Sequence, residues 1–227
     1  MIRLRDRYDL GRLLQTGKFA RVAKRSSSSR WKSRQEKDPF VRRARMEGYR
    51  SRAVFKLIEM HERDRLIASG DTVVDLGATP GGWSQFAAAI VGDRGRVIAI
   101  DIIPMDPIDG VTFIHGDFRE DEILVKLHDM AAPGTIDLVM SDMAPNITGV
   151  RGIDQPRAMH LADLALDMAR KGLKPGGTLV LKLFHGEGFD DYVREVRQAF
   201  ADVRVRKPAA SRPQSRETYL VARNYRV

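Results

Sequence analysis

Short apolar runs alternate along most of this sequence with segments whose apolar residues recur at helical spacing. The apolar runs predict strands at residues 72–76, 97–100, 112–115, 136–141 and 178–184, and the segments between them predict helices at 83–90, 120–130, 156–172 and 188–200. Such alternation is typical of βαβ units, whose right-handed crossovers produce a mostly parallel sheet with helices on both faces. The sequence therefore predicts a doubly wound α/β domain.

The C-terminal part of the chain departs from this alternation. Two apolar runs, 203–207 and 217–222, are separated by a loop rich in Pro, Ser and Arg, with no helix between them. Strands joined without a crossover pair antiparallel, so we expect a hairpin at the end of the sheet. With the five preceding strands, this hairpin gives a seven-stranded sheet of the Rossmann-like type.

The N-terminal part is basic and has few regularly spaced apolar residues. It contains four consecutive serines, Ser26 to Ser29, and its few large anchors are Trp31 and Phe40. From about Glu47 the apolar residues predict a helix, which we expect to end at Gly70. We therefore expect a largely flexible extension over residues 1–46 and a single catalytic domain over residues 47–227.

Charge is distributed unevenly along the chain. Residues 1–52 hold 17 Lys/Arg against 5 Asp/Glu, residues 53–203 hold 15 against 24, and residues 204–227 hold 7 against 1. An acidic middle between two basic ends is typical of a catalytic body whose ends bind a polyanion such as nucleic acid. Solvated charged tails are the alternative explanation.

The composition also excludes several classes of protein. No apolar run approaches the roughly 20 residues needed to span a bilayer, and no hydrophobic signal core follows the basic N-terminus. The absence of cysteine excludes disulfides, thiolate metal sites and cysteine nucleophiles. We expect a cytoplasmic monomer without a metal site.

A lysine interrupts the most apolar of the predicted strands. Lys182 lies in the middle of the run 178–184, where burial of an unpaired ammonium costs several kcal/mol. Such a lysine has partners or a chemical task, unless the strand lies at a sheet edge, where lysine prevents aggregation. Asp142, which follows the strand 136–141, is a candidate partner.

A glycine-rich loop follows the first predicted strand. Gly77, Gly81 and Gly82 allow the backbone to turn sharply and to approach a ligand, in the loop that makes the closest contact in doubly wound sheets. A tight turn alone would also explain these glycines. Thr79 and Pro80 replace the dinucleotide-binding pattern G-x-G-x-x-G, which disfavours NAD.

Acidic residues occur in or after three successive strands. Asp75 lies in the first, Asp101 ends the second, where a carboxylate can accept both ribose hydroxyls of an adenosine, and Asp117 follows the third, where it can accept from an adenine amino group. Any one of them could be a helix N-cap. Together they fit S-adenosylmethionine, which has a ribose, an adenine and a carboxylate for the helix N-terminus but no phosphates.

From about Tyr49 onward the sequence resembles the FtsJ-type heat-shock methyltransferases, the ribosomal RNA large subunit methyltransferase E family. The matching motifs, in order, are YRSRAVFKL from Tyr49, DLG from Asp75, PGGWSQ from Pro80, PMDP from Pro104, GDFR from Gly116, SDMAPN from Ser141, PRAM from Pro156, GEGFD from Gly186 and SRE from Ser215. They extend over roughly four-fifths of the chain. Thr79 stands where the family pattern has alanine.

The resemblance implies methyl transfer from S-adenosylmethionine to the ribose 2′-hydroxyl of a uridine in the A-loop of 23S rRNA, with the 50S subunit as partner. It also implies a catalytic tetrad of Lys56, Asp142, Lys182 and Glu217, with Lys182 as proton acceptor. The residues expected to bind the cofactor are Gly77, Gly81, Gly82, Trp83, Asp75, Asp101, Asp117 and Asp142.

Two states of Lys182 are compatible with the sequence. Burial, Lys56 and the cofactor sulfonium would lower its pKa, whereas Asp142 and Glu217 would raise it. Lys182 therefore either accepts the proton as a neutral amine or stays charged and orients the hydroxyl. Lys56 is a candidate for steering the target nucleotide.

Basic residues near both ends of the domain are candidates for phosphate contacts, which give salt-dependent affinity. These are Arg42, Arg43, Arg45, Arg50, Arg52, Arg204, Arg206, Lys207, Arg212 and Arg216. Tyr49 is a candidate for stacking on the target base, whereas Phe55 is better explained as a core residue. Two alternatives stay open: a 2′-O-methyltransferase acting on tRNA or an mRNA cap, and a non-catalytic RNA-binding ribosome-assembly factor.

Overall fold

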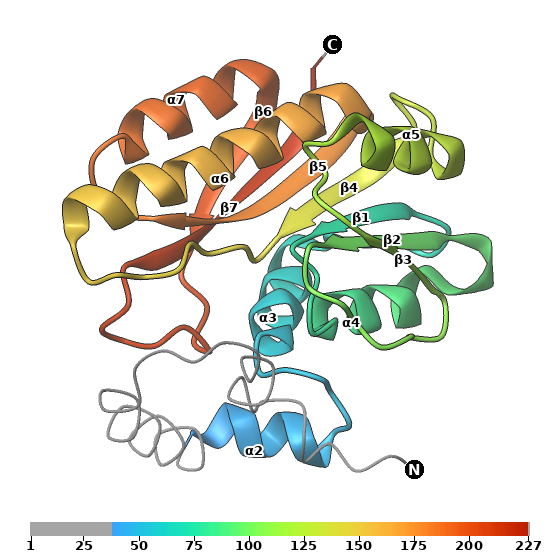
Figure 1. Cartoon of the computed structure of the whole chain (residues 1–227), viewed down its shortest axis with the longest axis horizontal. Coiled ribbons are helices and arrows are strands. Elements are labelled where there is room, and N and C mark those ends of the chain that lie inside the picture. The colour runs from blue at the N-terminus through green and yellow to red at the C-terminus, as the bar shows by residue number, and fades with distance from the viewer. Residues whose placement is uncertain (1–37, 227) are drawn as a thin grey trace, which may run out of the picture.

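A seven-stranded sheet with the strand order β3-β2-β1-β4-β5-β7-β6 organises the molecule (Figure 1). The computed structural model describes residues 38–226. Neighbouring strands pair in parallel from β3 through β5, whereas β7 pairs antiparallel with both β5 and β6. The predicted fold class, with its antiparallel C-terminal pair, is confirmed. The strands are β1 Thr72–Leu76, β2 Arg96–Asp101, β3 Val111–His115, β4 Ile136–Ser141, β5 Leu173–Phe184, β6 Phe200–Arg206 and β7 Glu217–Tyr225.

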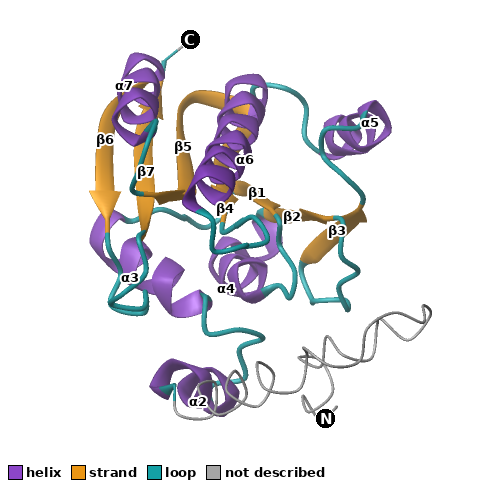
Figure 2. Cartoon of the chain, turned by 60° about the vertical axis from the view of Figure 1, so that its left-hand side comes forward, coloured by secondary structure: helices purple, strands orange, loops and turns teal. Residues whose placement is uncertain are grey.

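Helices cover both faces of the sheet (Figure 2). One face is covered by α5, α6 and α7, and the other by α3 and α4, while α2 lies below α3 in Figure 1. In residues 38–226, no helix combines the length and apolar character that crossing a membrane requires. The helices are α2 Pro39–Met46, α3 Val54–Asp64, α4 Gly82–Val91, the short 3-10 helix η2 Gly92–Arg94, α5 Asp121–Met130, α6 Arg151–Gly172 and α7 Phe189–Ala199.

Alternation of side chains along the strands gives each face of the sheet its own core. On β1, Val74 and Leu76 belong to the core under α5, α6 and α7, whereas Val73 belongs to the core under α3 and α4. Val74, Leu76 and Val73 are all fully buried. Burial on both faces explains why β1 reads as a continuous apolar run.

The helix expected from about Glu47 begins later in the structure, at Val54. Gly48 has a φ of +75°, and the backbone N–H of Arg50 donates to Gln85 Oε1 on α4 at 3.2 Å. This contact with α4 holds the segment before Val54 in a non-helical path. The helix ends at Asp64, before the expected Gly70, because Arg65 adopts a left-handed conformation with a φ of +50°.

Helix α2 lies within the segment that the sequence predicted to be largely flexible. Asp38 caps it by accepting from Phe40 N at 3.0 Å, and buried Ala44 packs with Phe55 of α3 and with Ala210 of the β6–β7 loop. Helix α2 is therefore attached to the domain. The four serines and Trp31 lie outside the described residues, and the domain boundary at residue 46 stays a prediction.

Strand order reverses between β1 and β4, which both pair in parallel with their neighbours. In doubly wound sheets, ligands bind beyond the carboxyl ends of the strands at such a reversal. Gly77 follows β1 and Asp142 follows β4 at this point. The fold thus brings the glycine-rich loop and the acid after β4 to one edge of the sheet.

A buried ion-pair cluster connects the end of α3 to β6. The carboxylate of Asp64 accepts two hydrogen bonds from Arg206, at 2.6 and 2.8 Å, and one from Arg204 at 3.2 Å. Its side chain is completely buried. The hydrogen bonds and charge of Arg206, with those of Arg204, hold the pKa of Asp64 below its ordinary value despite the opposing effect of burial.

We predict that Asp64→Asn lowers the free energy of unfolding by about 3 kcal/mol, because it leaves the Arg206 guanidinium without its carboxylate. The lowered pKa makes the ion pair fully stabilising above the ordinary pKa of 3.8, and this contribution disappears as the pH falls through the lowered value. Urea unfolding at pH 7 and in acid measures both effects. A variant as stable as the wild type at pH 7 would contradict the assignment.

Candidate active site

The carboxylate of Asp142 lies at the centre of a charged cluster beyond the end of β4. Its Oδ1 atom lies 2.6 Å from Lys182 Nζ, and its backbone oxygen accepts from the same Nζ at 2.9 Å. Tyr219 Oη donates to Oδ1 at 2.5 Å. Because Lys182 is on β5 and Tyr219 on β7, one carboxylate joins three strand segments.

Lys56 belongs to the same cluster from the opposite side. In the first turn of α3, its Nζ lies 3.0 Å from Glu217 Oε1, 2.8 Å from Tyr219 Oη and 3.9 Å from Asp142 Oδ1. Lys56 is only 6% exposed. The structure therefore brings together all four predicted tetrad residues, but it places Lys56 among protein partners instead of toward a nucleotide.

The ionisation of these groups reflects their mutual contacts. Burial would raise the pKa of Asp142 and of Glu217, but the ammonium groups of Lys56 and Lys182 hold both values below the ordinary range. Burial, with the charge of Lys182, lowers the pKa of Lys56 against the opposing effect of both carboxylates. The two carboxylates are therefore ionised at neutral pH.

Tyr219 is a central residue that sequence reasoning missed. It is fully buried, and burial together with the nearby carboxylates raises the pKa of its hydroxyl well above the ordinary value, so the hydroxyl stays protonated. It donates to Asp142 and accepts from Lys56. The pairing of the strands could have identified it, because Tyr219 lies opposite Lys182 across β5 and β7. Tyr219 also follows Glu217 by two residues.

The glycine-rich loop approaches the same edge of the sheet. Gly77 has a φ of +71°, and a Cβ atom there would lie 2.3 Å from Met143 Cγ. Gly81 has a φ of +98°, and its Cβ would lie 2.5 Å from Ile108 Cδ1. A Cβ on Gly82 would lie 2.5 Å from Ser51 Oγ. Gly77 and Gly81 therefore need glycine for their positive φ, and a Cβ at any of the three positions would force a neighbouring side chain to shift.

Two of the predicted cofactor acids lie at the ends of neighbouring strands. Asp101 accepts from Thr79 N and from Ile103 N, both at 2.8 Å, and so joins the glycine-rich loop to the loop after β2. The carboxylate of Asp117 is paired with Arg119, whose Nε lies 2.9 Å from both oxygens. Each carboxylate has more lone pairs than these contacts use. Both can therefore accept a further hydrogen bond.

Asp75 and Trp83 lie deeper in the protein. Asp75 is 2% exposed and accepts from Ser84 Oγ at 2.6 Å, and burial raises its pKa to about 7. Trp83 is 3% exposed, and its Nε1 donates to Ala53 O at 2.8 Å. Its ring packs against Tyr219 with 5.8 Å between centroids. Through these contacts, the two side chains stabilise the positions of the glycine-rich loop and α3.

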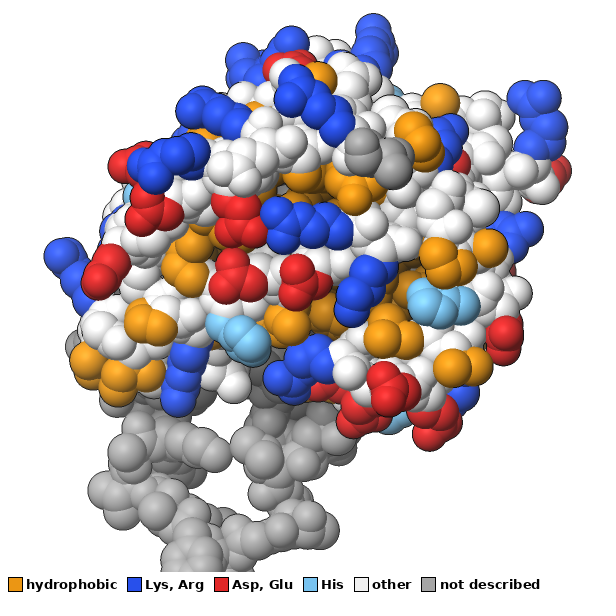
Figure 3. Space-filling model, turned by 90° about the horizontal axis from the view of Figure 1, so that it is seen from above, with side chains coloured by type: hydrophobic (Ala, Val, Ile, Leu, Met, Phe, Trp, Pro, Cys, Tyr) orange, Lys and Arg blue, Asp and Glu red, His pale blue; other side chains and the backbone are white. Residues whose placement is uncertain are grey.

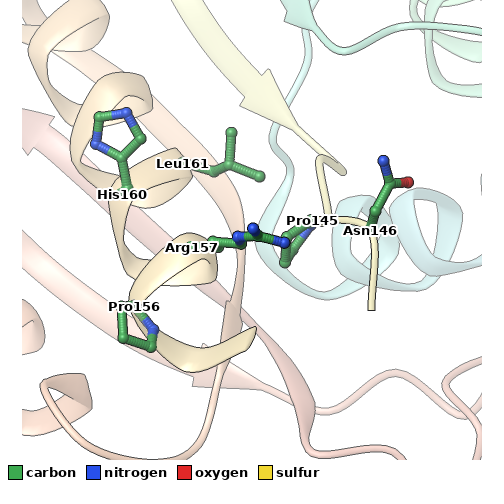
Figure 4. A pocket seen from close by; sticks show the side chains of 6 residues that line it. All are labelled: Pro145, Asn146, Pro156, Arg157, His160 and Leu161. Atoms are coloured by element: carbon green, nitrogen blue, oxygen red, sulfur yellow. The ribbon is translucent and has the colours of Figure 1, made fainter. Parts of the chain in front are cut away.

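A hollow of about 500 Å³ lies between α6 and the loop after β4 (Figure 4). Figure 4 shows Arg157 extending from α6 toward Pro145, with His160 one helical turn further along α6. Asn146 lies at the far side of the hollow. The walls are mostly apolar, with the guanidinium of Arg157 and the imidazole of His160 at the rim. One of the lining residues, Pro145, follows Asp142 by three positions in the sequence.

Most of the arginines that the sequence offered as phosphate ligands are engaged inside the protein. The guanidinium of Arg50 donates to backbone oxygens of Asp106 and Pro107, and that of Arg52 pairs with Asp38 and donates to Ala210 O. Arg204 and Arg206 bind Asp64, as described above. Arg43 pairs with Glu47 and lies over the ring of Phe55, which is a core residue.

Four further arginines of this group are exposed, as Arg43 and Arg204 also are. Arg42 and Arg45 on α2 and Arg212 in the β6–β7 loop are exposed and form no ion pair with any residue of 38–226. Arg216, also exposed, donates to His185 O at 3.1 Å. Because α2 and the β6–β7 loop pack together through Ala44 and Ala210, these side chains lie at one end of the molecule.

The geometry can support proton transfer at an amine beside a ligand-binding loop. Lys182 supplies the amine, its carboxylate partner is ionised, and the site lies where doubly wound sheets bind ligands. Within residues 38–226, no group of three or more His, Asp or Glu side chains is arranged to hold a metal ion. The groups that this cluster offers for chemistry are the amine of Lys182 and the carboxylates of Asp142 and Glu217.

Comparison with known proteins places this chain in a family. The chain is 54% identical over 206 residues to the ribosomal RNA large subunit methyltransferase E of Marinobacter nauticus, covering 91% of this chain and all of that protein. The crystal structure of a ribosomal RNA methyltransferase from Plasmodium falciparum matches with a TM-score of 0.67 at 29% identity, covering 78% of this chain and 98% of that one. The model of the FtsJ-like methyltransferases matches residues 49–225. The chain belongs to the FtsJ-like methyltransferase family.

Proposed function

We propose that this protein transfers a methyl group from S-adenosylmethionine to the ribose 2′-hydroxyl of a uridine in the A-loop of 23S rRNA. Its substrate is the 50S subunit in the cytoplasm, and it acts as a monomer. The observation that carries this proposal is the position of Lys182, which Asp142 binds at the same edge of the sheet as the glycine-rich loop. The name of the Marinobacter relative, a ribosomal RNA large subunit methyltransferase, supports the choice of RNA.

The residues at the reversal of strand order between β1 and β4 fit the cofactor. The backbone of the glycine-rich loop can bind the methionine part, Asp101 can accept from the ribose hydroxyls, and Asp117 can accept from the adenine amino group. Asp117 would share its carboxylate with Arg119. When bound, S-adenosylmethionine supplies an electrophilic methyl group on a sulfonium.

The contacts of Lys182 leave it able to interact with the ribose 2′-hydroxyl. Its Nζ donates two hydrogen bonds to Asp142, one to Oδ1 and one to the backbone oxygen, so one of its three positions is left for a substrate. A ribose hydroxyl must be aligned with the methyl group and must lose its proton. We propose that Lys182, in its neutral amine state, accepts this proton through its lone pair, and that the ionised Asp142 stabilises the ammonium that forms.

Lys56 and Glu217 stabilise the positions of Asp142 and Lys182. Lys56 is buried and contacts Glu217, Tyr219 and Asp142, so its charge balances the two carboxylates. Without it, Asp142 and Glu217 would repel each other in a poorly solvated site. We therefore assign Lys56 to positioning of the tetrad instead of to steering the nucleotide.

The direct test uses the purified protein, S-adenosylmethionine and 50S subunits from cells that lack the gene. Nucleoside mass spectrometry of the 23S rRNA should show new 2′-O-methyluridine, and Lys182→Ala should reduce its rate of formation by about 10²–10⁴-fold through loss of the proton acceptor. Lys171→Ala, which changes an exposed lysine of α6, is the matched control and should keep the wild-type rate.

Other outcomes distinguish the alternatives. Methylation of tRNA or capped mRNA with no change in 50S subunits would show a different RNA substrate. Binding of 50S subunits with no methylated product would indicate a non-catalytic assembly factor. Full activity of Lys182→Ala would contradict the role of Lys182 while leaving the overall reaction intact.

Arg45 and Arg212 should contribute to RNA binding through their charge. We predict that the double variant Arg45→Ala/Arg212→Ala raises KM for the 50S subunit and leaves S-adenosylmethionine binding unchanged. The magnitude of the slope of log K for RNA binding against log[salt] should fall by about 2, one for each lost phosphate contact. Affinity measurements at several salt concentrations give this slope.

The matched control for this prediction lies on another face. Figure 3 shows basic and acidic side chains interspersed on the face seen from above, which α6 and α7 cover. There Arg194 pairs with Asp191 at 3.0 Å. Arg194→Ala should leave the salt slope unchanged, and an equal effect of both changes would mean that Arg45 and Arg212 have no special role.

A further inference from the structure

Arg50 connects the glycine-rich loop to the loop 102–110, which joins β2 to β3. Its guanidinium donates to the backbone oxygen of Asp106 at 2.6 Å and to that of Pro107, and it lies 3.5 Å from that of Pro80. Pro80 belongs to the glycine-rich loop, whereas Asp106 and Pro107 belong to the loop 102–110. One side chain therefore contacts both of the loops that follow the first two strands.

The backbone around Arg50 is itself fixed to the first turn of α4. The side-chain amide of Gln85 accepts from Arg50 N at 3.2 Å and donates to Gly48 O at 3.0 Å. Three residues after Arg50, the backbone oxygen of Ala53 accepts from Trp83 Nε1 at 2.8 Å. Because the backbone is held on both sides of Arg50, the guanidinium extends from a fixed position toward the two loops.

The loop 102–110 packs directly against Gly81. A Cβ atom on Gly81 would lie 2.5 Å from Ile108 Cδ1, 2.7 Å from Met105 Sδ and 3.5 Å from Arg50 Cδ. These three side chains occupy the space that a side chain at Gly81 would need. The loop 102–110 and the glycine-rich loop are therefore in close contact beside Arg50.

The beginning of the same loop orients the carboxylate of Asp101. Asp101 Oδ1 accepts from Ile103 N and Asp101 Oδ2 accepts from Thr79 N, both at 2.8 Å. Thr79 Oγ1 donates to Ile103 O, also at 2.8 Å. The proposed function assigns Asp101 to the ribose hydroxyls of the cofactor. A shift of the loop would therefore remove an N–H that orients this carboxylate.

The loop 102–110 has little packing of its own to hold it in place. Its residues form neither helix nor strand, and none of them is buried. Ile102 and Ile103 are 65% and 51% exposed. Hydrogen bonds from a charged guanidinium to backbone oxygens are stronger than those between neutral groups. The position of the loop therefore depends strongly on Arg50.

We infer that Arg50 is a positioning residue of the cofactor site: it holds the loop 102–110 against Gly81 and so keeps Asp101 in place for the adenosine part of S-adenosylmethionine. The inference rests on the proposed function, which makes S-adenosylmethionine the cofactor. It replaces the expectation from sequence that Arg50 contacts an RNA phosphate. The two roles differ in what they require, because a phosphate contact tolerates lysine, whereas several backbone oxygens need the donors of a planar guanidinium.

The test compares Arg50→Ala and Arg50→Lys with the wild-type protein. Calorimetric titration with S-adenosylmethionine alone should show about 10-fold weaker binding to both variants, as expected if the loop keeps its bound position about one tenth of the time. KM for S-adenosylmethionine should rise by the same factor, while kcat at saturating cofactor stays at the wild-type value. The slope of log K for RNA binding against log[salt] should also stay unchanged.

Arg52→Ala is the matched control for these variants. The guanidinium of Arg52 is also engaged inside the protein, but it binds Asp38 and the backbone oxygen of Ala210 and contacts neither cofactor loop. Arg52→Ala should therefore bind S-adenosylmethionine as tightly as the wild type. An equal loss of affinity in Arg52→Ala and Arg50→Ala would mean that general loosening of the domain explains the effect, which would overturn the role of Arg50.

The remaining outcomes separate this inference from the proposed function. A wild-type protein that does not bind S-adenosylmethionine would contradict the proposed function, and the inference would fall with it. Wild-type affinity for the cofactor in both Arg50 variants would overturn the inference alone. A salt slope whose magnitude falls by about 1 in Arg50→Ala and recovers in Arg50→Lys would identify a phosphate contact instead. If Arg50→Ala does not fold, Arg50→Lys, which keeps the charge, provides the same measurements.

Discussion

The bond between the carboxylate of Asp142 and the ammonium of Lys182 is the interaction on which the rest of the site depends. Lys182 lies in the largely apolar and buried run 178–184 of β5, and its charge is tolerated there because Asp142 lies 2.6 Å away. The same carboxylate accepts from Tyr219 and attracts Lys56. Removal of Asp142 would leave two largely buried ammonium groups close together without the anion that separates them.

The strands could be predicted from sequence because each depends on local pattern, and the resemblance named the four residues that the structure brings together. The apolar runs of β1, β2, β4 and residues 178–184 of β5 are buried on both faces, and Lys182 stands out as a charged residue in such a run. The order of Lys56, Asp142, Lys182 and Glu217 in the chain followed from motifs. Their convergence depends only on the sheet, which places the ends of β4 and β5 and the start of β7 together.

What the sequence did not predict depends on contacts between distant residues. Tyr219 joins the site only because β5 and β7 pair with Lys182 opposite it. The helix expected from Glu47 begins at Val54 because Arg50 binds Gln85 and the loop after β2, some 35 to 57 residues away. No local pattern distinguishes an arginine that tethers a loop from one that binds a phosphate. The contacts of Arg50, Arg52, Arg204 and Arg206 therefore had to come from the structure.

The most direct test of the coupled tetrad is the titration of its lysines, followed by NMR of protein labelled with 13C at lysine Cε. The wild-type protein should show Lys56 titrating below its ordinary pKa of 10.5. In Asp142→Asn the pKa of Lys56 should fall further, because the carboxylate that favours the ammonium is lost. An ordinary pKa for Lys56 in the wild type, or a pKa that Asp142→Asn leaves unchanged, would contradict the account.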